Sequence, residues 1–457
     1  MKNKPIFIRA LSVIAILLIS LVSCVERPDE IQSDWKWEDG FEIDNSYDTA
    51  LQLRFREYEE NSNLAFSQNS DTDGSAFDVE VTEGGVRIVK YTGRENIVVI
   101  PEKIDGMSVV AIGSEAFAGS SVRAVKIPDS VLKIEKGAFA NCNNLSTIRV
   151  PFVGDGGEHT HFGYIFGAEK YENHAVTVPP SLDMVIVGDG ESEIADNAFS
   201  GCKTVSAVVF SKNLEKIGEF AFYECRDLVY ISSVNEVRTV GKYAFAYCSS
   251  LFSVNFNNAD SIDLGAFYEC NSIFEIGLAF IGNGGENNHL GYIFGAESSD
   301  YNDEYVPVSL KRVVLGANCK KIPDRAFANC AYVAEVDIPY TESVGIRAFY
   351  GCRSLENVDL PMVKEICDDA FFGCDNIQSA NLGNGVEKIG MQAFFGCRSL
   401  KDIVIPEKVT EILPSTFAYC TALENVEMKN VKEIGKDAFL GCDLLTNGTQ
   451  NGDDLEK

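Results

Sequence analysis

The fold is decided by a stretch that reads IGMQAFFGC at residues 389–397 and LKDIVIP at residues 400–406. Its first part holds the pair Ala393 and Phe394, with Cys397 three residues after the phenylalanine. Its second part has apolar residues at alternating positions and ends in a proline, which predicts a short strand with one buried face. One unit of the chain is therefore expected to contain a turn followed by a strand.

The motif built on Ala-Phe with a following cysteine occurs twelve times, and its phenylalanines are spaced by 22 or 23 residues except for two spacings of 60. Thr416 replaces the alanine in the eleventh copy, and Ser120 replaces the cysteine in the first. A single unit cannot bury its apolar face, so the units must stack as coils of a solenoid whose strands form a parallel sheet. The phenylalanines expected in its core are Phe117, Phe139, Phe199, Phe222, Phe245, Phe267, Phe327, Phe349, Phe371, Phe394, Phe417 and Phe439.

These coils resemble the BspA-like leucine-rich repeat family, whose repeat joins Ile-Gly-x-x-Ala-Phe-x-x-Cys to a Leu-x-x-Val-x-Ile-Pro strand. Residues 389–406 match this pattern nearly letter for letter, and the resemblance covers about four-fifths of the chain, residues 78–446. It implies a leucine-rich repeat solenoid with a parallel β-sheet on its concave face, and short helical turns and strands elsewhere. It also implies a bacterial surface protein used for adhesion or protein recognition.

The N-terminus is typical of an exported lipoprotein. Basic residues precede the apolar stretch 10–22, and residues 21–24 resemble a lipobox that ends in Cys24. We predict a signal peptide at 1–23 and a lipidated, flexible, acidic tether at 24–76, which anchors the protein to the outer membrane or cell surface. The alternatives are an uncleaved anchor helix, or a secretory signal in which the cysteine is incidental.

Composition excludes several function classes. The formal net charge of −29 would repel phosphate backbones, which argues against nucleic-acid binding. Only four histidines are present, and the chain has no nucleophile elbow, zinc-protease motif or phosphate-binding loop. We therefore expect no enzyme activity and no cofactor.

The cysteines are expected to be structural. Eleven follow the motif phenylalanines and would lie in a row, one per coil, with parallel side chains. This geometry disfavours disulfides and metal binding, so buried thiols are predicted. Cys319 and Cys367 lie outside the row and are interpreted as unpaired surface thiols.

The two 60-residue spacings predict two long coils, residues 152–187 and 279–315. Glu158, His159 and His161 suggest a metal site in the first, but Asn287 replaces His159 in the second, so a structural role is preferred. A calcium site in the acidic segment 300–304 is rejected because the spacing is wrong. Four aromatic residues are assigned to the cores of the long coils, namely Tyr164, Phe166, Tyr292 and Phe294.

Candidate ligand-binding residues are those that the strands should point away from the core, onto the concave face. They are Tyr230, Glu275, Glu335, Asp337, Asn357, Asp359, Asn381 and Asp402. Three tyrosines of the long coils are added as exposed anchors, since aromatic residues dominate binding hot spots: Tyr171, Tyr301 and Tyr305. The alternative is that this polar row is only a solvated surface.

The sequence thus predicts a non-catalytic surface lipoprotein that binds an extracellular or surface protein and attaches to the membrane through its N-terminal lipid. Two alternatives stay open: a periplasmic envelope scaffold, and an accessory protein that captures glycans. The solenoid is expected at 77–446, followed by a polar, frayed tail at 447–457.

Overall fold

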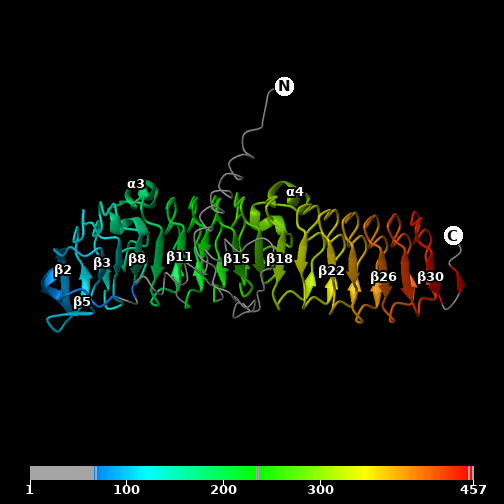
Figure 1. The fold of residues 1–457 in the computed structure, drawn as a ribbon, viewed down its shortest axis with the longest axis horizontal. Coiled ribbons are helices and arrows are strands. Elements are labelled where there is room, and N and C mark those ends of the chain that lie inside the picture. The colour runs from blue at the N-terminus through cyan, green and yellow to red at the C-terminus, as the bar shows by residue number, and fades with distance from the viewer. Residues whose placement is uncertain are drawn as a thin grey trace, which may run out of the picture. The chain divides into compact units, whose positions relative to one another are not determined.

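The computed structural model describes Phe66, residues 69–450 except 211, 233 and 235, and residues 453–454. The predicted signal peptide, Cys24 and most of the predicted tether lie outside the described residues. From residue 69 onward the chain forms a row of stacked coils (Figure 1). None of the helices in this described part is long and apolar enough to cross a membrane.

Each coil contributes one strand to the main row of parallel strands. This row pairs in three sheets, β3–β13, β15–β20 and β22–β30. Its strands are β3 (Ile97–Val99), β6 (Ala124–Lys126), β8 (Thr147–Val150), β9 (Met184–Val187), β11 (Ala207–Val209), β13 (Tyr230–Ile231), β15 (Ser253–Phe256), β17 (Glu275–Leu278), β18 (Arg312–Leu315), β20 (Glu335–Asp337), β22 (Asn357–Asp359), β24 (Ser379–Asn381), β26 (Asp402–Ile405), β28 (Asn425–Met428) and β30 (Asn447–Gln450).

A second row consists of two-residue strands, usually a Lys-Ile or Glu-Ile pair with the aliphatic residue buried. They are β7 (Lys133–Ile134), β10 (Glu193–Ile194), β12 (Lys216–Ile217), β14 (Thr239–Val240), β16 (Ser261–Ile262), β19 (Lys321–Ile322), β21 (Ser343–Val344), β23 (Glu365–Ile366), β25 (Lys388–Ile389), β27 (Glu411–Ile412) and β29 (Glu433–Ile434). The repeating Ala-Phe segment follows each short strand as a turn. The predicted solenoid of stacked coils is confirmed.

The alternation predicted for the strands is present in the structure. In β26, Ile403 and Ile405 are buried while Asp402 and Val404 are exposed. One face of the strand row therefore packs on the core, as expected for a strand with a side-chain period of two.

The motif phenylalanines form two runs of ring contacts in the core, one from Phe117 to Phe294 and one from Phe327 to Phe439. Phe222 and Phe245 stack with ring centroids 5.1 Å apart and an interplanar angle of 3°. In the first long coil, Phe162 and Phe166 bridge the gap between the neighbouring motif rings Phe139 and Phe199. Phe439 is only half-buried, because it belongs to the last Ala-Phe turn and is covered from one side.

The repeat cysteines are buried thiols, as predicted. Nine of them donate a hydrogen bond to the carbonyl oxygen of a motif phenylalanine in the preceding coil, as Cys248 Sγ does to Phe222 O at 3.1 Å. Burial raises the pKa of the Cys248 thiol well above its ordinary value. The thiol thus adds a second donor to a buried carbonyl oxygen, since Phe222 O also accepts from the Cys225 amide at 3.1 Å.

The interpretation of Cys319 as a surface thiol is wrong. Its side chain is buried and lies 3.5 Å from the carbonyl oxygen of Lys321, because the chain turns back into the core before β19. Cys367 is half-buried. No disulfide joins any of the cysteines in the described part of the chain.

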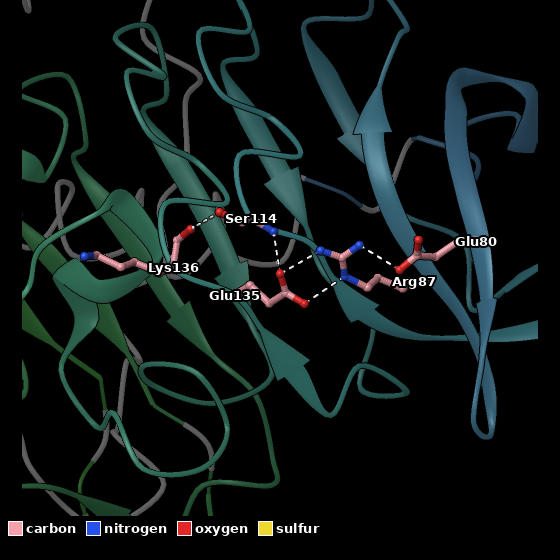
Figure 2. A network of polar contacts seen from close by, with 5 residues as sticks. All are labelled: Glu80, Arg87, Ser114, Glu135 and Lys136. Atoms are coloured by element: carbon pink, nitrogen blue, oxygen red, sulfur yellow. Dashed lines mark hydrogen bonds and ion pairs between the residues drawn. The ribbon is translucent and has the colours of Figure 1, made fainter.

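An antiparallel hairpin closes the N-terminal end of the row. It consists of β1 (Phe77–Thr82) and β2 (Gly85–Tyr91), and β2 pairs with β5 (Met107–Ile112), which also pairs with β4 (Lys103–Ile104). Arg87 connects this hairpin to the stack (Figure 2): Nε and Nη2 donate to the Glu135 carboxylate at 2.7 Å, and Nη1 to Glu80 at 2.8 Å. The Ser114 amide donates to the same Glu135 carboxylate at 2.9 Å.

Both predicted ends of the solenoid need correction. Before β1, Thr72 N donates to Val99 O at 2.8 Å and Val99 N donates to Thr72 Oγ1 at 3.1 Å, and η1 (Gly74–Ala76) follows. Residues 72–76 of the predicted tether therefore pack on the stack. After residue 446, β30 pairs with β28, and β31 (Asp453–Asp454) returns antiparallel to β30. An open strand edge recruits such pairing through its unpaired backbone groups even where the side chains are polar.

Candidate binding surfaces

The outward side of the main strand row, here called the sheet face, is open and acidic from β20 to β28. Asn357, Asp359, Asn381 and Asp402 are exposed there, as predicted. Glu335 is also exposed, whereas Asp337 is half-buried. The structure therefore brings most of the predicted polar residues onto one continuous strip.

Hydrogen bonds between successive coils order this strip. Asn381 Nδ2 donates to Asp359 Oδ1 at 2.7 Å, and Asn425 Nδ2 donates to Asp402 Oδ1 at 2.6 Å. Each amide uses one of the two carboxylate oxygens of the aspartate beside it. These hydrogen bonds hold the carboxylates in fixed positions. The carboxylates therefore lose less conformational entropy when a partner's donors bind them.

Two of the predicted ligand-binding residues are not available on this face. Glu275 is 3% exposed, because the Arg312 side chain of the next strand covers it; Arg312 Nη1 lies 3.2 Å from Glu275 Oε2 and Nη2 lies 2.6 Å from Asp337. Tyr230 is 4% exposed, and its register neighbour in β11, Ala207, is buried as well. In this part of the sheet, the packing of Tyr230 and Ala207 removes apolar surface from water, which favours their burial over exposure to solvent.

The polarity and exposure of the sheet face therefore change along the row of strands. Near the N-terminal end, Phe66 packs with Val99 and Ala124 in a small apolar cluster separate from the main core, with Ile186 against it. Burial raises the pKa of Glu275 to about 7, although Arg312 opposes this rise. The predicted binding residues extend from β13 to β26, but those that are exposed lie from β20 onward.

The long coils contain the histidines for which a metal role was considered. The first coil carries η2 (Phe162–Phe166), η3 (Tyr171–Asn173) and α3 (His174–Thr177); the second carries η4 (Leu290–Phe294), η5 (Ser299–Tyr301) and α4 (Asn302–Tyr305). His161 Nδ1 lies 3.0 Å from His174 Nε2, and His174 Nδ1 donates to the Ser200 carbonyl at 2.7 Å. Over the ranges that the structure describes, no three His, Cys, Asp or Glu side chains are grouped to hold a metal.

A polar cavity of about 420 Å³ adjoins the second long coil. Its lining combines acidic and basic side chains: Glu286, Asn288, His289, Ser299, Lys321, Pro323 and Asp324. His289 donates through Nδ1 to Asn302 at 3.0 Å, which leaves Nε2 as the acceptor nitrogen. This cavity has no signature in the sequence, because its walls come from two separate segments, 286–299 and 321–324.

The three predicted tyrosine anchors are exposed. Tyr171, Tyr301 and Tyr305 are 37%, 49% and 38% exposed. The two long coils place α3 and α4 at the same edge of the row of coils (Figure 1). Phe166 and Phe294 are buried, as predicted, whereas Tyr164 and Tyr292 are half-buried.

A family model described as BspA type leucine-rich repeat region, in six copies, matches residues 98–154, 179–281, 304–364 and 342–451. These segments cover most of the chain. The protein belongs to the BspA-type leucine-rich repeat family. The gaps between the matched segments fall in the two long coils, which depart from the family's regular repeat.

Solved structures of other leucine-rich repeat proteins are similar to this BspA-type chain. One from Bacteroides ovatus is 22% identical, with 79% of this chain and 100% of that chain covered and a TM-score of 0.36. A leucine-rich cell surface protein from Faecalibacterium prausnitzii is 22% identical, with 84% and 95% covered and a TM-score of 0.28. A comparison with curated protein sequences returned no match.

Proposed function

We propose that this protein is a non-catalytic, cell-surface binding protein whose sheet face from β20 to β28 recognises a protein partner that carries basic side chains. The observation that carries the proposal is the ordered strip of exposed carboxylates and amides, including Asp359 and Asp402. Fixed acidic groups on one face attract and orient a basic partner. Leucine-rich repeat solenoids are generally non-enzymatic, which supports a binding role.

The location is part of the same proposal. BspA-type proteins are typically bacterial surface proteins, and the N-terminal stretch that ends in Cys24 is typical of a lipidation signal. A lipid on Cys24 would hold the chain at the envelope, with the solenoid directed outward. Protease treatment of intact cells tests this: release of peptides from the solenoid while the cells stay sealed is expected. Survival of the solenoid until the envelope is opened would exclude adhesion to an outside partner.

The binding face is tested separately by substitution. Asp359→Asn with Asp402→Asn removes two charges from the strip and keeps the side-chain shape. Glu411→Gln with Glu433→Gln removes two exposed charges from the short-strand row and is the matched control. Salt-dependent binding of a basic partner protein is expected to weaken several-fold only in the first variant. Equal weakening in both would show that net charge alone, and not this face, attracts the partner.

A further inference from the structure

Six aromatic side chains form a connected surface cluster, five on the turns between the two long coils and one on α4 of the second long coil. We call it the aromatic patch; its members are Phe220, Tyr223, Tyr243, Tyr247, Tyr268 and Tyr305. The first five close a ring of contacts with centroid distances between 5.4 and 6.0 Å, and Tyr305 joins at 6.3 Å from Tyr268. Tyr247 and Tyr305 are exposed and the others are half-buried.

The patch lies on turns, away from the strands of the sheet face. In each of these coils the motif phenylalanine, such as Phe222 or Phe245, points into the core. The residues two positions before it and one or two after it then lie at the surface. Successive coils bring these surface positions together, so four coils contribute to one cluster.

Three patch residues occupy unfavourable backbone conformations. Phe220, Tyr243 and Tyr247 have φ angles of 54°, 53° and 64°, in the left-handed region that a bulky side chain rarely adopts. Most other coils place Gly, Asn, Asp or another polar residue at these turn positions, for example Asn197, Asp369 and Gly351. Tyr419, with a φ angle of 61°, is an aromatic exception outside the patch. Such a conformation costs about 1–2 kcal/mol per residue. Tyr247 is 36% exposed, so burial offsets only part of this cost.

Two glycines make room for the rings. A Cβ atom on Gly265 would lie 2.3 Å from Tyr243 Cε1, and one on Gly295 would lie 2.8 Å from Tyr268 Cδ2. The neighbouring coils are thus shaped to let the tyrosines lie across them. An exposed aromatic surface that is held by strained turns and fitted glycines is the kind of feature that marks a binding site.

The surroundings of the patch indicate the charge of its ligand. Glu219, Glu269 and Glu304, each next in sequence to a patch residue, are exposed and acidic. Lys242 already places its ammonium 5.4 Å from the centroid of the Tyr243 ring, so a cation fits against this surface. Aromatic faces beside carboxylates bind ammonium and guanidinium groups by cation–π attraction and charge.

We propose that the aromatic patch is a second docking surface, which takes arginine or lysine side chains of a protein partner. This inference rests on the proposed function in so far as the partner is a protein, but it uses a surface other than the sheet face. Four of the six ring contacts are edge-to-face, with interplanar angles of 68°, 81°, 86° and 81°. Such rings enclose inserted side chains better than they form a flat platform for a sugar.

A peptide experiment tests the patch on the full chain. The probe is a fluorescent arginine–glycine peptide, with the same peptide bearing glutamine for arginine as the negative probe. The test variant is Tyr247→Leu with Tyr305→Leu, which keeps the net charge. The control is Tyr332→Leu with Tyr340→Leu, two exposed tyrosines outside the patch that also carry a lysine over the ring. Thermal melting confirms that each variant folds.

We expect the arginine peptide to bind and the test variant to weaken it about tenfold, from the loss of two cation–π contacts. The control pair and the sheet-face variant Asp359→Asn with Asp402→Asn should leave peptide affinity unchanged. Loss of peptide binding only in the sheet-face variant would overturn the patch while leaving the proposed function intact. Equal loss in both tyrosine pairs, no loss, or binding of a neutral linear glucan in place of the peptide would also overturn it.

Discussion

His174 and Asn302, at equivalent positions of the two long coils, make the same three hydrogen bonds. His174 Nδ1 donates to Ser200 O at 2.7 Å, and Asn302 Nδ2 donates to Ala328 O at 3.0 Å. His174 Nε2 and Asn302 Oδ1 each accept from a glycine amide, at 3.2 and 3.0 Å, and each lies 3.0 Å from a histidine Nδ1. Imidazole and carboxamide are interchangeable here because each offers one donor and one acceptor.

The first long coil has a titratable histidine where the second has an asparagine, so we predict that the stability of the first long coil falls in acid. Burial, and then His161, lower the pKa of His174 from 6.5 to about 3. The unfolded chain therefore binds a proton at His174 near pH 6.5 while the folded chain does not, so the stability contributed by neutral His174 is lost as pH falls from about 6.5 towards 3. His174→Asn should flatten this dependence. Hydrogen exchange of the first long coil across this pH range measures it, and Asn302→His should transfer the sensitivity to the second coil.

The cysteine row predicts a graded response to substitution. Cys248→Ala should lower the free energy of unfolding by about 0.5–1.5 kcal/mol, because the Phe222 carbonyl loses the thiol donor and keeps only the Cys225 amide. Cys248→Ser should recover part of this loss, since Ser120 stands at the corresponding place in the first coil. Urea unfolding measures both. Cys367→Ala, at a half-buried thiol, is the control, and a loss as large there would argue against the carbonyl role.

The pair of Glu275 and Arg312 predicts that stability falls as pH rises, which is the opposite of the effect predicted for His174. The pKa of Glu275 rises from 4.5 to about 7 by burial, so the folded chain holds a proton that the unfolded chain has released. Its contribution to stability is therefore full below pH 4.5 and is lost as pH rises through 7. Glu275→Gln should remove this dependence in thermal melting. Arg312→Met should shift the melting temperature down at pH 8 more than at pH 5, whereas Arg398→Met, in an exposed pair with Asp375, should not.

The N-terminal hairpin is predicted to depend on Arg87. Arg87→Met removes the paired contacts to Glu135, which are partly shielded from solvent, and should destabilise the hairpin by about 1–2 kcal/mol. Limited proteolysis should then cut residues 77–91 faster. Glu80→Gln removes only the more exposed contact and should have a smaller effect. Equal proteolysis of both variants would show that Glu135 does not hold the hairpin.

The repeat, its core and its strand alternation follow from the amino-acid sequence alone. Phe394 and Ile403 recur at the same places in each unit, and burying them has only one solution, which is to stack the units. The sites that depend on one unit alone, such as the thiol of Cys397 or the exposed Asp402, were predicted for the same reason.

Which outward positions are open depends on contacts between neighbouring coils. Asp402 and Glu275 are equivalent in the repeat, but Arg312 of the next coil covers Glu275 and no such side chain covers Asp402. The aromatic patch was missed because its tyrosines lie in turns, where no periodic alternation shows which side chains reach the surface. Exposure and clustering are properties of neighbouring coils together, and a pattern within one coil does not contain them.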